Sequence, residues 1–173
     1  MNKSKIEIGI LGGSFDPAHK GHLAISKEAR KRFKLKKIIW AITKKNPLKA
    51  VSKTPVSKRI KDCKKLIGLN TFIKVKFYED TINSNKTIDL INYLKKNKKL
   101  EIFFLMGADN LISFHKWHKS KLITEKCNII VFDRHGYKKN SLKSKAFKKL
   151  NNKTLTFVKF KKVNISSSQL RKI

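Results

Sequence analysis

Acidic residues, cysteines and long apolar runs are all scarce in this chain. Its 173 residues hold 11 Asp and Glu and two cysteines, Cys63 and Cys127. The two thiols lack the CxxC spacing of a zinc knuckle, which argues against a disulfide framework and favours buried, reduced side chains. No apolar run approaches the roughly 20 residues that span a bilayer, and the N-terminus lacks a signal-peptide core. We therefore expect a cytoplasmic protein without a membrane partner.

Positive charge is abundant instead, with 43 Lys and Arg and a formal net charge of +32 at pH 7. These residues are almost all lysines, and they are spread along the whole chain rather than gathered in an Arg-rich stripe. A nucleic-acid surface concentrates its basic residues, so we interpret the lysines as solvated faces and expect no specific nucleic-acid partner. Charge of this size still attracts phosphorylated small molecules, and salt weakens that attraction.

Apolar runs of strand length alternate with stretches of helical period along the chain. This alternation is typical of βαβ units, and it predicts an α/β fold, a doubly wound, mostly parallel sheet with helices on both faces. A chain of 173 residues has about the length of one domain, so we expect a single domain over residues 1–173. Ligands of such sheets bind in the loops that follow the strands. Strands are predicted at residues 7–11, 37–43, 72–78, 101–106, 128–132 and 156–160, and helices at about 21–33, 57–67, 87–96, 119–124 and 141–150, with a short one near 168–172.

The loop after the first predicted strand holds the strongest functional signal. Residues 12–22 read G-G-S-F-D-P-A-H-K-G-H. Gly12 and Gly13 let the backbone turn sharply, and the helix that follows offers N–H groups and a positive dipole end to phosphate. His19 and His22 lie three residues apart, so both rings project from one face of that helix. A metal half-site is the alternative, but the third ligand of a zinc-protease pattern does not follow, and the pattern favours a phosphate site without a protein-bound metal.

This segment resembles the H-x-G-H nucleotidylyltransferase superfamily, whose members share G-G-[ST]-F-[DN]-P-x-H-x-G-H. Residues 165–171 read I-S-S-S-Q-L-R, which is similar to the superfamily's I-S-S-T-x-[IL]-R segment over the β and γ phosphates. Alone, this second segment would indicate a serine N-cap followed by a surface arginine. The resemblance implies a Rossmann-like nucleotidylyltransferase fold, with an ATP site made by Gly12, Gly13, Ser14, Phe15, His19, His22, Gly107, Asp109, Ser166, Ser167 and Arg171.

Further segments bear on the acceptor. Residues 106–117 contain M-G-A-D-N-L and F-H-K-W, which resemble the G-[AQ]-D-x-[LM]…W segment of nicotinate mononucleotide adenylyltransferases, where the tryptophan stacks on the pyridine ring. R-H-G-Y at 134–137 and N-P-L-K at 46–49 are similar to that family's R-x-G-[YF] turn and P-P-H-K loop. Where the family has Y-T-x-D-T, Lys86 and Leu90 depart from the pattern. The implied acceptor site is Asp16, Lys49, Thr87, Trp117, Arg134 and Tyr137, although simple core or rim packing would explain Trp117 and Tyr137 equally well outside this context.

The resemblance implies an enzyme that transfers the adenylyl group of ATP to nicotinate mononucleotide in NAD biosynthesis. It implies catalytic roles for His19, His22, Lys49 and Arg171, with Mg²⁺ bound through the phosphates of ATP. One alternative is a relative that uses phosphopantetheine or glycerol phosphate as acceptor. Another is a basic nucleic-acid-binding protein with a degenerate phosphate site. The sequence leaves open whether nicotinamide mononucleotide is also accepted and whether the protein is a monomer or a homodimer.

Overall fold

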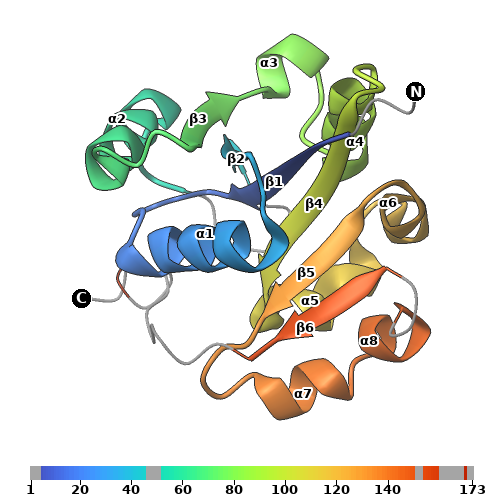
Figure 1. Ribbon diagram of the computed structural model, residues 1–173. Helices are drawn as coiled ribbons and strands as arrows, with labels where there is room; N and C mark the ends of the chain where they lie inside the picture. Colours follow the sequence, from blue (N-terminus) through green and yellow to red (C-terminus); the bar gives the residue numbers. More distant parts are fainter. Residues whose placement is uncertain (1–4, 46–51, 151–153, 160–169, 171–173) are drawn as a thin grey trace.

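A six-stranded parallel sheet forms the centre of the protein (Figure 1). The computed structural model describes residues 5–45, 52–150, 154–159 and 170. The strand order is β3-β2-β1-β4-β5-β6, and every neighbouring pair is parallel. The predicted doubly wound sheet is therefore confirmed. The strands are β1 (Ile6–Gly13), β2 (Lys37–Ile42), β3 (Ile73–Phe77), β4 (Leu100–Gly107), β5 (Asn128–Phe132) and β6 (Leu155–Val158).

Side chains of the strands alternate between two separate apolar cores, because successive residues of a strand point to opposite faces of the sheet. In β2, Ile38, Trp40 and Ile42 belong to one core, and Ile39 and Ala41 belong to the other. Burial on both faces explains why the strands appear in the sequence as nearly continuous apolar runs.

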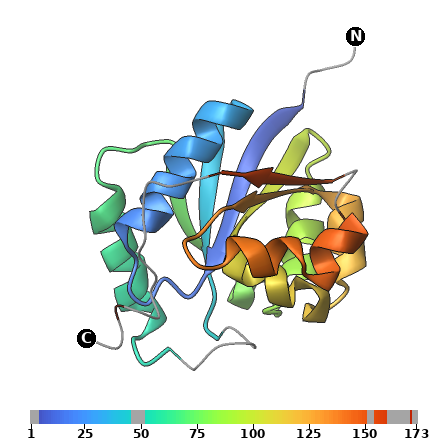
Figure 2. The same cartoon turned by 90° about the horizontal axis from the view of Figure 1, so that it is seen from below.

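Helices cover both faces of the sheet (Figure 2). On one face lie α1 (Lys20–Phe33) and α2 (Val56–Ile67), which contribute Ala29 and Cys63 to the core beneath them. On the other face lie α4 (Thr87–Lys95), α5 (Ala108–Ser113), the 3₁₀ helix η1 (Phe114–Lys116), α6 (Ser120–Lys126) and α8 (Lys145–Leu150). Two short helices complete the described chain, α3 (Glu79–Ile82) and α7 (Lys138–Leu142).

The predicted helices at about 21–33, 57–67, 87–96 and 119–124 are confirmed by α1, α2, α4 and α6, and the remaining helices differ from prediction. The predicted helix at 141–150 is wrong as one element, because α7 ends at Leu142 and the Ser144 hydroxyl then accepts a hydrogen bond from Phe147 N at 3.1 Å, which caps α8. The sequence analysis also missed α3, α5 and η1, whose lengths of 4, 6 and 3 residues are too short to display a helical period. Of the predicted helix at 168–172, the structure describes Leu170 alone, which is helical.

The expected states of the two cysteines are confirmed. Both Cys63 and Cys127 are buried and unbridged, and burial raises the pKa of each thiol to about 12. Within residues 5–45, 52–150, 154–159 and 170, no helix has the length and apolar character required to cross a membrane.

The core in the middle of the sheet should tolerate little truncation. Leu105 of β4 is fully buried, whereas Leu69, in the turn after α2, is 97% exposed. Leu105→Ala should therefore lower the free energy of unfolding by about 2–5 kcal/mol, because it removes buried methyl groups and leaves a cavity. Urea unfolding monitored by circular dichroism measures this change. Leu69→Ala makes the same chemical change in solvent and should stay within about 0.5 kcal/mol of the parent protein, so equal losses would contradict the core described above.

Candidate active site

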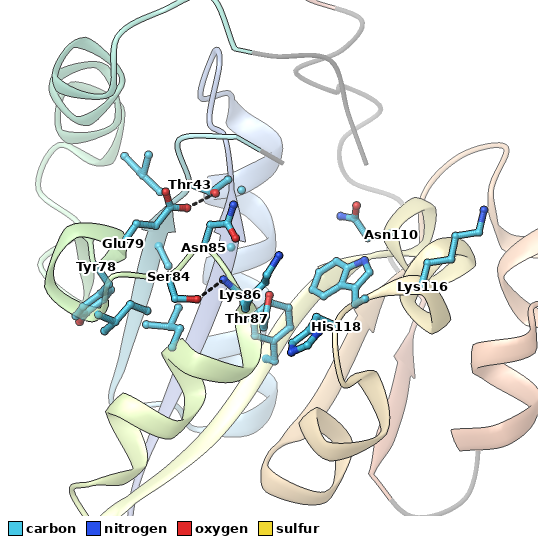
Figure 3. A pocket seen from close by; sticks show the side chains of 18 residues that line it. Thr43, Tyr78, Glu79, Ser84, Asn85, Lys86, Thr87, Asn110, Lys116 and His118 are labelled. Atoms are coloured by element: carbon cyan, nitrogen blue, oxygen red, sulfur yellow. Dashed lines mark hydrogen bonds between the residues drawn. The ribbon is translucent and has the colours of Figure 1, made fainter. Parts of the chain in front are cut away.

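The sheet reverses its direction of growth between β1 and β4, since β2 and β3 lie on one side of β1 and β4 to β6 on the other. Doubly wound sheets bind their ligands at this switch point, outside the carboxyl ends of the strands. A cavity of about 340 Å³ opens there (Figure 3). Its walls are Gly12, Gly13, Ala41, Ile42, Thr43, Tyr78, Glu79, Ile82, Ser84, Asn85, Lys86, Thr87, Leu90, Phe104, Asn110, Lys116, Trp117 and His118.

His19 and His22 form a reciprocal cap at the start of α1. The Nδ1 atom of His19 accepts a hydrogen bond from Gly21 N at 3.1 Å, and the Nδ1 atom of His22 accepts one from His19 N at 3.2 Å. An imidazole that accepts at Nδ1 carries its proton at Nε2 when it is neutral. The ring centroids lie 3.8 Å apart. The loop therefore holds two Nε2–H donors side by side, as a phosphate ligand requires.

The electrostatic surroundings keep His19 neutral. Burial lowers its pKa from 6.5 to about 4, and the nearby positive charge of Arg134 contributes in the same direction. At neutral pH the ring therefore acts as a hydrogen-bond donor without carrying a charge.

A buried aromatic stack supports His22 from the core. Phe15 is 1% exposed, and its ring centroid lies 4.6 Å from that of His22 and 5.1 Å from that of Trp40. The indole N–H of Trp40 donates to Ser26 Oγ at 2.8 Å, and Ser26 Oγ donates to His22 O at 2.9 Å. The side chain of Phe15 thus packs behind His22 and is buried. The predicted contact of Phe15 with ATP would therefore have to come from its backbone.

A partly buried ion pair joins the loops that follow β4 and β5. Arg134 Nη1 lies 2.8 Å from Asp109 Oδ2, and the guanidinium lies 5.7 Å from the ring centroid of Tyr137. A Cβ atom on Gly107 would lie 2.5 Å from Asp109 Oδ1, so only glycine lets this carboxylate fold over the end of β4. Asp109 therefore orders this edge of the site through Arg134.

Arg59 of α2 is a site residue that the sequence analysis missed. It is 3% exposed, and its guanidinium donates to four carbonyl oxygens, those of Ser14 (2.6 Å), Thr43 (2.8 Å), Thr54 (2.9 Å) and Lys44 (3.4 Å). Burial lowers its pKa from the ordinary value. These bonds tie the loop after β1 to the loop after β2 and to the start of α2. The signal available in the sequence was an arginine on the otherwise apolar face of a predicted helix.

The acceptor residues predicted from the sequence divide into two groups. Thr87 and Trp117 both line the cavity, and Trp117 makes edge contacts with Phe104 and Phe114 at centroid distances of 5.9 and 5.2 Å. Trp117 therefore packs against the core and lines the cavity at once. The other described candidates do not belong to the cavity lining: Asp16, Arg134 and Tyr137.

Asp16 lies at the edge of the phosphate loop. It is 6% exposed, and its Oδ2 accepts a hydrogen bond from Thr54 N at 3.5 Å. The peptide bond between Asp16 and Pro17 is cis. This hydrogen bond joins the carboxylate of Asp16 to the segment that precedes α2.

Four predicted residues lie outside the described parts of the chain: Lys49, Ser166, Ser167 and Arg171. Their assignments stay predictions.

The whole chain is similar to known adenylyltransferases. Residues 10–173 match the family described as cytidylyltransferase-like. The chain is 66% identical over 173 residues to a probable nicotinate-nucleotide adenylyltransferase of Pelagibacter ubique (strain HTCC1062), covering 100% of this chain and 96% of the relative. This chain belongs to the nicotinate-nucleotide adenylyltransferase family. A second member, a probable nicotinate-nucleotide adenylyltransferase of Agrobacterium fabrum, is 37% identical over 75% of this chain and 70% of its own length.

Solved structures show the same fold. The Plasmodium falciparum nicotinic acid mononucleotide adenylyltransferase complexed with NaAD superposes with a TM-score of 0.79 at 21% identity, covering 96% of this chain and 82% of that one. A putative nicotinate-nucleotide adenylyltransferase from Vibrio parahaemolyticus superposes with a TM-score of 0.59 at 20% identity, covering 72% of each chain. The predicted Rossmann-like nucleotidylyltransferase fold is confirmed.

Replacement of Arg59 should destabilise the fold even when the new residue is lysine. Arg59→Lys keeps the charge but cannot bond four carbonyl oxygens, and carbonyls left buried without donors are costly. The free energy of unfolding should fall by about 2–3 kcal/mol in urea denaturation. Arg32 provides the matched control, because it is exposed and forms a salt bridge with Glu28 at 2.6 Å on the surface of α1. Arg32→Lys should change stability by less than about 1 kcal/mol, and an equal effect of the two substitutions would refute the role of Arg59.

His19 should titrate far below an ordinary histidine. In the fold it stays neutral down to about pH 4, whereas the unfolded chain takes up that proton near pH 6.5. The stability that this ring contributes is therefore complete above pH 6.5 and is lost as the pH falls from there through 4. An NMR titration of the His19 ring protons, assigned with His19→Asn, checks this. In the urea-unfolded chain, the same signal should titrate with a midpoint near pH 6.5. A midpoint near pH 6.5 in the folded protein would disprove the lowered pKa of His19.

Proposed function

We propose that this protein transfers the adenylyl group of ATP to nicotinate mononucleotide, producing nicotinate adenine dinucleotide and pyrophosphate for NAD biosynthesis. The observation that carries the proposal is the pair of imidazole donors at the start of α1, directly after the loop that leaves β1, while Gly12 and Gly13 at the carboxyl end of β1 line an aromatic-walled cavity. The names of the relatives that are 66% and 37% identical support the same reaction. The shared fold with the Plasmodium falciparum nicotinic acid mononucleotide adenylyltransferase, whose structures hold NaAD and APC, supports it as well.

The paired histidines fit the chemistry of this transfer. An oxygen of the acceptor's phosphate attacks the α-phosphorus of ATP, while the bond from that phosphorus to the bridging oxygen of the β-phosphate breaks. Pyrophosphate leaves with the electron pair. Such reactions need alignment and stabilisation of charge on the phosphate oxygens more than proton transfer, because the attacking phosphate is already ionised. We assign this stabilisation to the Nε2–H groups of His19 and His22, which are held by their Nδ1 contacts.

Further donors complete the proposed ATP site. Backbone groups of Gly12, Gly13 and Ser14 would approach the phosphates, and Arg59 holds this loop through the carbonyl of Ser14. Gly107 and Asp109 would border the adenylate on the β4 side. Lys49, Ser166, Ser167 and Arg171 would bind the triphosphate and the leaving pyrophosphate, as the family resemblance implies.

Mg²⁺ is proposed as a cofactor carried by ATP. Imidazole Nε2–H and backbone N–H groups suit phosphate oxygens rather than a cation, so the described loop fits a metal that the nucleotide itself binds. When bound, Mg²⁺ would neutralise charge on the departing pyrophosphate.

The cavity suits the pyridine nucleotide. Its volume of about 340 Å³ is that of a small-molecule site, and Trp117 offers a flat face that its contacts with Phe104 and Phe114 hold in place. We place the pyridine ring on Trp117, beside Thr87. Asp16, Arg134 and Tyr137 would act from outside this cavity, through the phosphate loop and the β5 edge.

The remaining assignments complete the proposal. Residues 1–173 would form a single nucleotidylyltransferase domain, monomeric or homodimeric, in the cytoplasm, with no specific nucleic acid as partner.

Pyrophosphate release by the purified protein with Mg-ATP tests the proposed reaction. Four acceptors are compared: nicotinate mononucleotide, nicotinamide mononucleotide, phosphopantetheine and glycerol phosphate, with CTP as the alternative donor. We expect turnover with ATP and nicotinate mononucleotide. A preference for phosphopantetheine or glycerol phosphate would overturn the acceptor assignment, and binding of RNA or DNA without turnover of any pair would overturn the enzymatic function.

His22→Ala tests catalysis by this site. Alanine removes the imidazole with both its Nδ1 acceptor for His19 N and the Nε2–H donor assigned to the phosphates. Loss of that donor should lower kcat by about two to three orders of magnitude, and the circular dichroism spectrum checks that the fold is preserved. Unchanged turnover would exclude His22 from the reaction.

A further inference from the structure

The acidic residues beside the cavity are already engaged by other groups. Glu79 accepts hydrogen bonds from Thr43 Oγ1 and, at 3.1 Å, from Lys44 N. Asp80 forms an ion pair with Lys44 Nζ at 2.6 Å. Asp89 accepts a hydrogen bond from Ser84 Oγ at 2.7 Å. The three carboxylates of segment 79–89 are thus each bound by another group, and of the three only Glu79 lines the cavity.

Lys86 differs from its neighbours in this segment. It precedes α4 directly, and its backbone N–H donates to Ser84 Oγ at 3.1 Å, which fixes where its side chain starts. Figure 3 shows this side chain reaching into the cavity, whereas Lys116 points away from the other labelled residues. Among the residues that the structure describes, no carboxylate forms an ion pair with Lys86. The ammonium group of Lys86 is therefore available to an anionic group of a ligand in this cavity.

We infer that Lys86 binds the carboxylate of the pyridine ring and makes the enzyme prefer the acid form of the acceptor to its amide. The inference rests on the proposed function and adds to it a residue that selects the substrate. Nicotinate mononucleotide carries a carboxylate where nicotinamide mononucleotide carries a neutral amide, so only the former gains from an ammonium group. The Lys86 side chain is exposed to solvent, and a pyridine ring seated on Trp117 would exclude water from the cavity and so strengthen the ion pair.

Glu79 places a negative charge in the wall of the cavity. Its carboxylate is held at the end next to β2, by Thr43 and Lys44, and it lines the same cavity as Lys86. A pyridine carboxylate is repelled by Glu79 and attracted by Lys86. His118 also lines the cavity and adds a polar ring to its wall.

Substitution of Lys86 should change selectivity more than turnover. The measured quantity is the ratio of kcat/KM for nicotinate mononucleotide to kcat/KM for nicotinamide mononucleotide. In Lys86→Gln this ratio should fall about tenfold, through a higher KM for the acid, while kcat and the values for the amide stay near those of the parent protein. Lys86→Arg keeps a cation at this position and should retain most of the ratio. Added salt should lower the ratio of the parent protein more steeply than that of Lys86→Gln, in which only the general positive charge of the protein still favours the acid.

Lys98→Gln serves as the matched control, since it removes the same charge from an exposed position before β4. Its ratio should equal that of the parent protein. Isothermal titration of each mononucleotide into the parent protein and Lys86→Gln separates binding from chemistry. If the parent protein turns over nicotinate mononucleotide and Lys86→Gln keeps the full ratio, the role of Lys86 is wrong while the proposed function stands. If the parent protein turns over neither mononucleotide, the proposed function itself fails.

Discussion

Parallel backbone pairing of β1 with both β2 and β4 is the constraint on which the rest of this structure depends. The register pairs Gly13 with Ile42 on one side and Leu11 with Leu105 on the other. Because β1 is flanked on both sides, its carboxyl end lies between the loops that leave β2 and β4. Gly12 and Gly13 line the cavity there, and the loop that follows them leads to the capped start of α1. The site is thus assembled by sheet hydrogen bonds before any ligand is bound.

Local charge pairing, rather than the total charge of +32, determines the character of this site. Arg59 on one flank satisfies backbone carbonyls, and Arg134 on the other bonds Asp109. Both guanidinium groups therefore hold in place segments that follow the carboxyl ends of the strands. Burial together with the charge of Arg134 keeps His19 neutral. Fixed hydrogen-bond donors of this kind require little reorganisation when charge develops on a phosphate, which is the basis of electrostatic catalysis.

The surroundings of Lys86 give a physical reason for its departure from the family pattern. In the sequence it looked like a loss, because lysine stands where the family has tyrosine. In the structure the nearby carboxylates of Glu79, Asp80 and Asp89 are engaged by other groups, and the side chain reaches into the cavity. A single substitution in a binding loop can therefore exchange one mode of recognition for another while the fold stays the same.

The sequence by itself determined the sheet, the long helices and the paired histidines, because apolar periodicity and motif spacing are local properties. It could not reveal that 141–150 breaks at Ser144, or that α3 and α5 exist, since single turns depend on a few capping contacts. Only the tertiary structure decided that Arg59 bonds the carbonyls of Ser14 and Thr43, which lie 45 and 16 residues away in sequence. It also decided that Thr87 and Trp117 line the cavity while Asp16, Arg134 and Tyr137 do not, because cavity walls are made by elements that meet only after the sheet has formed.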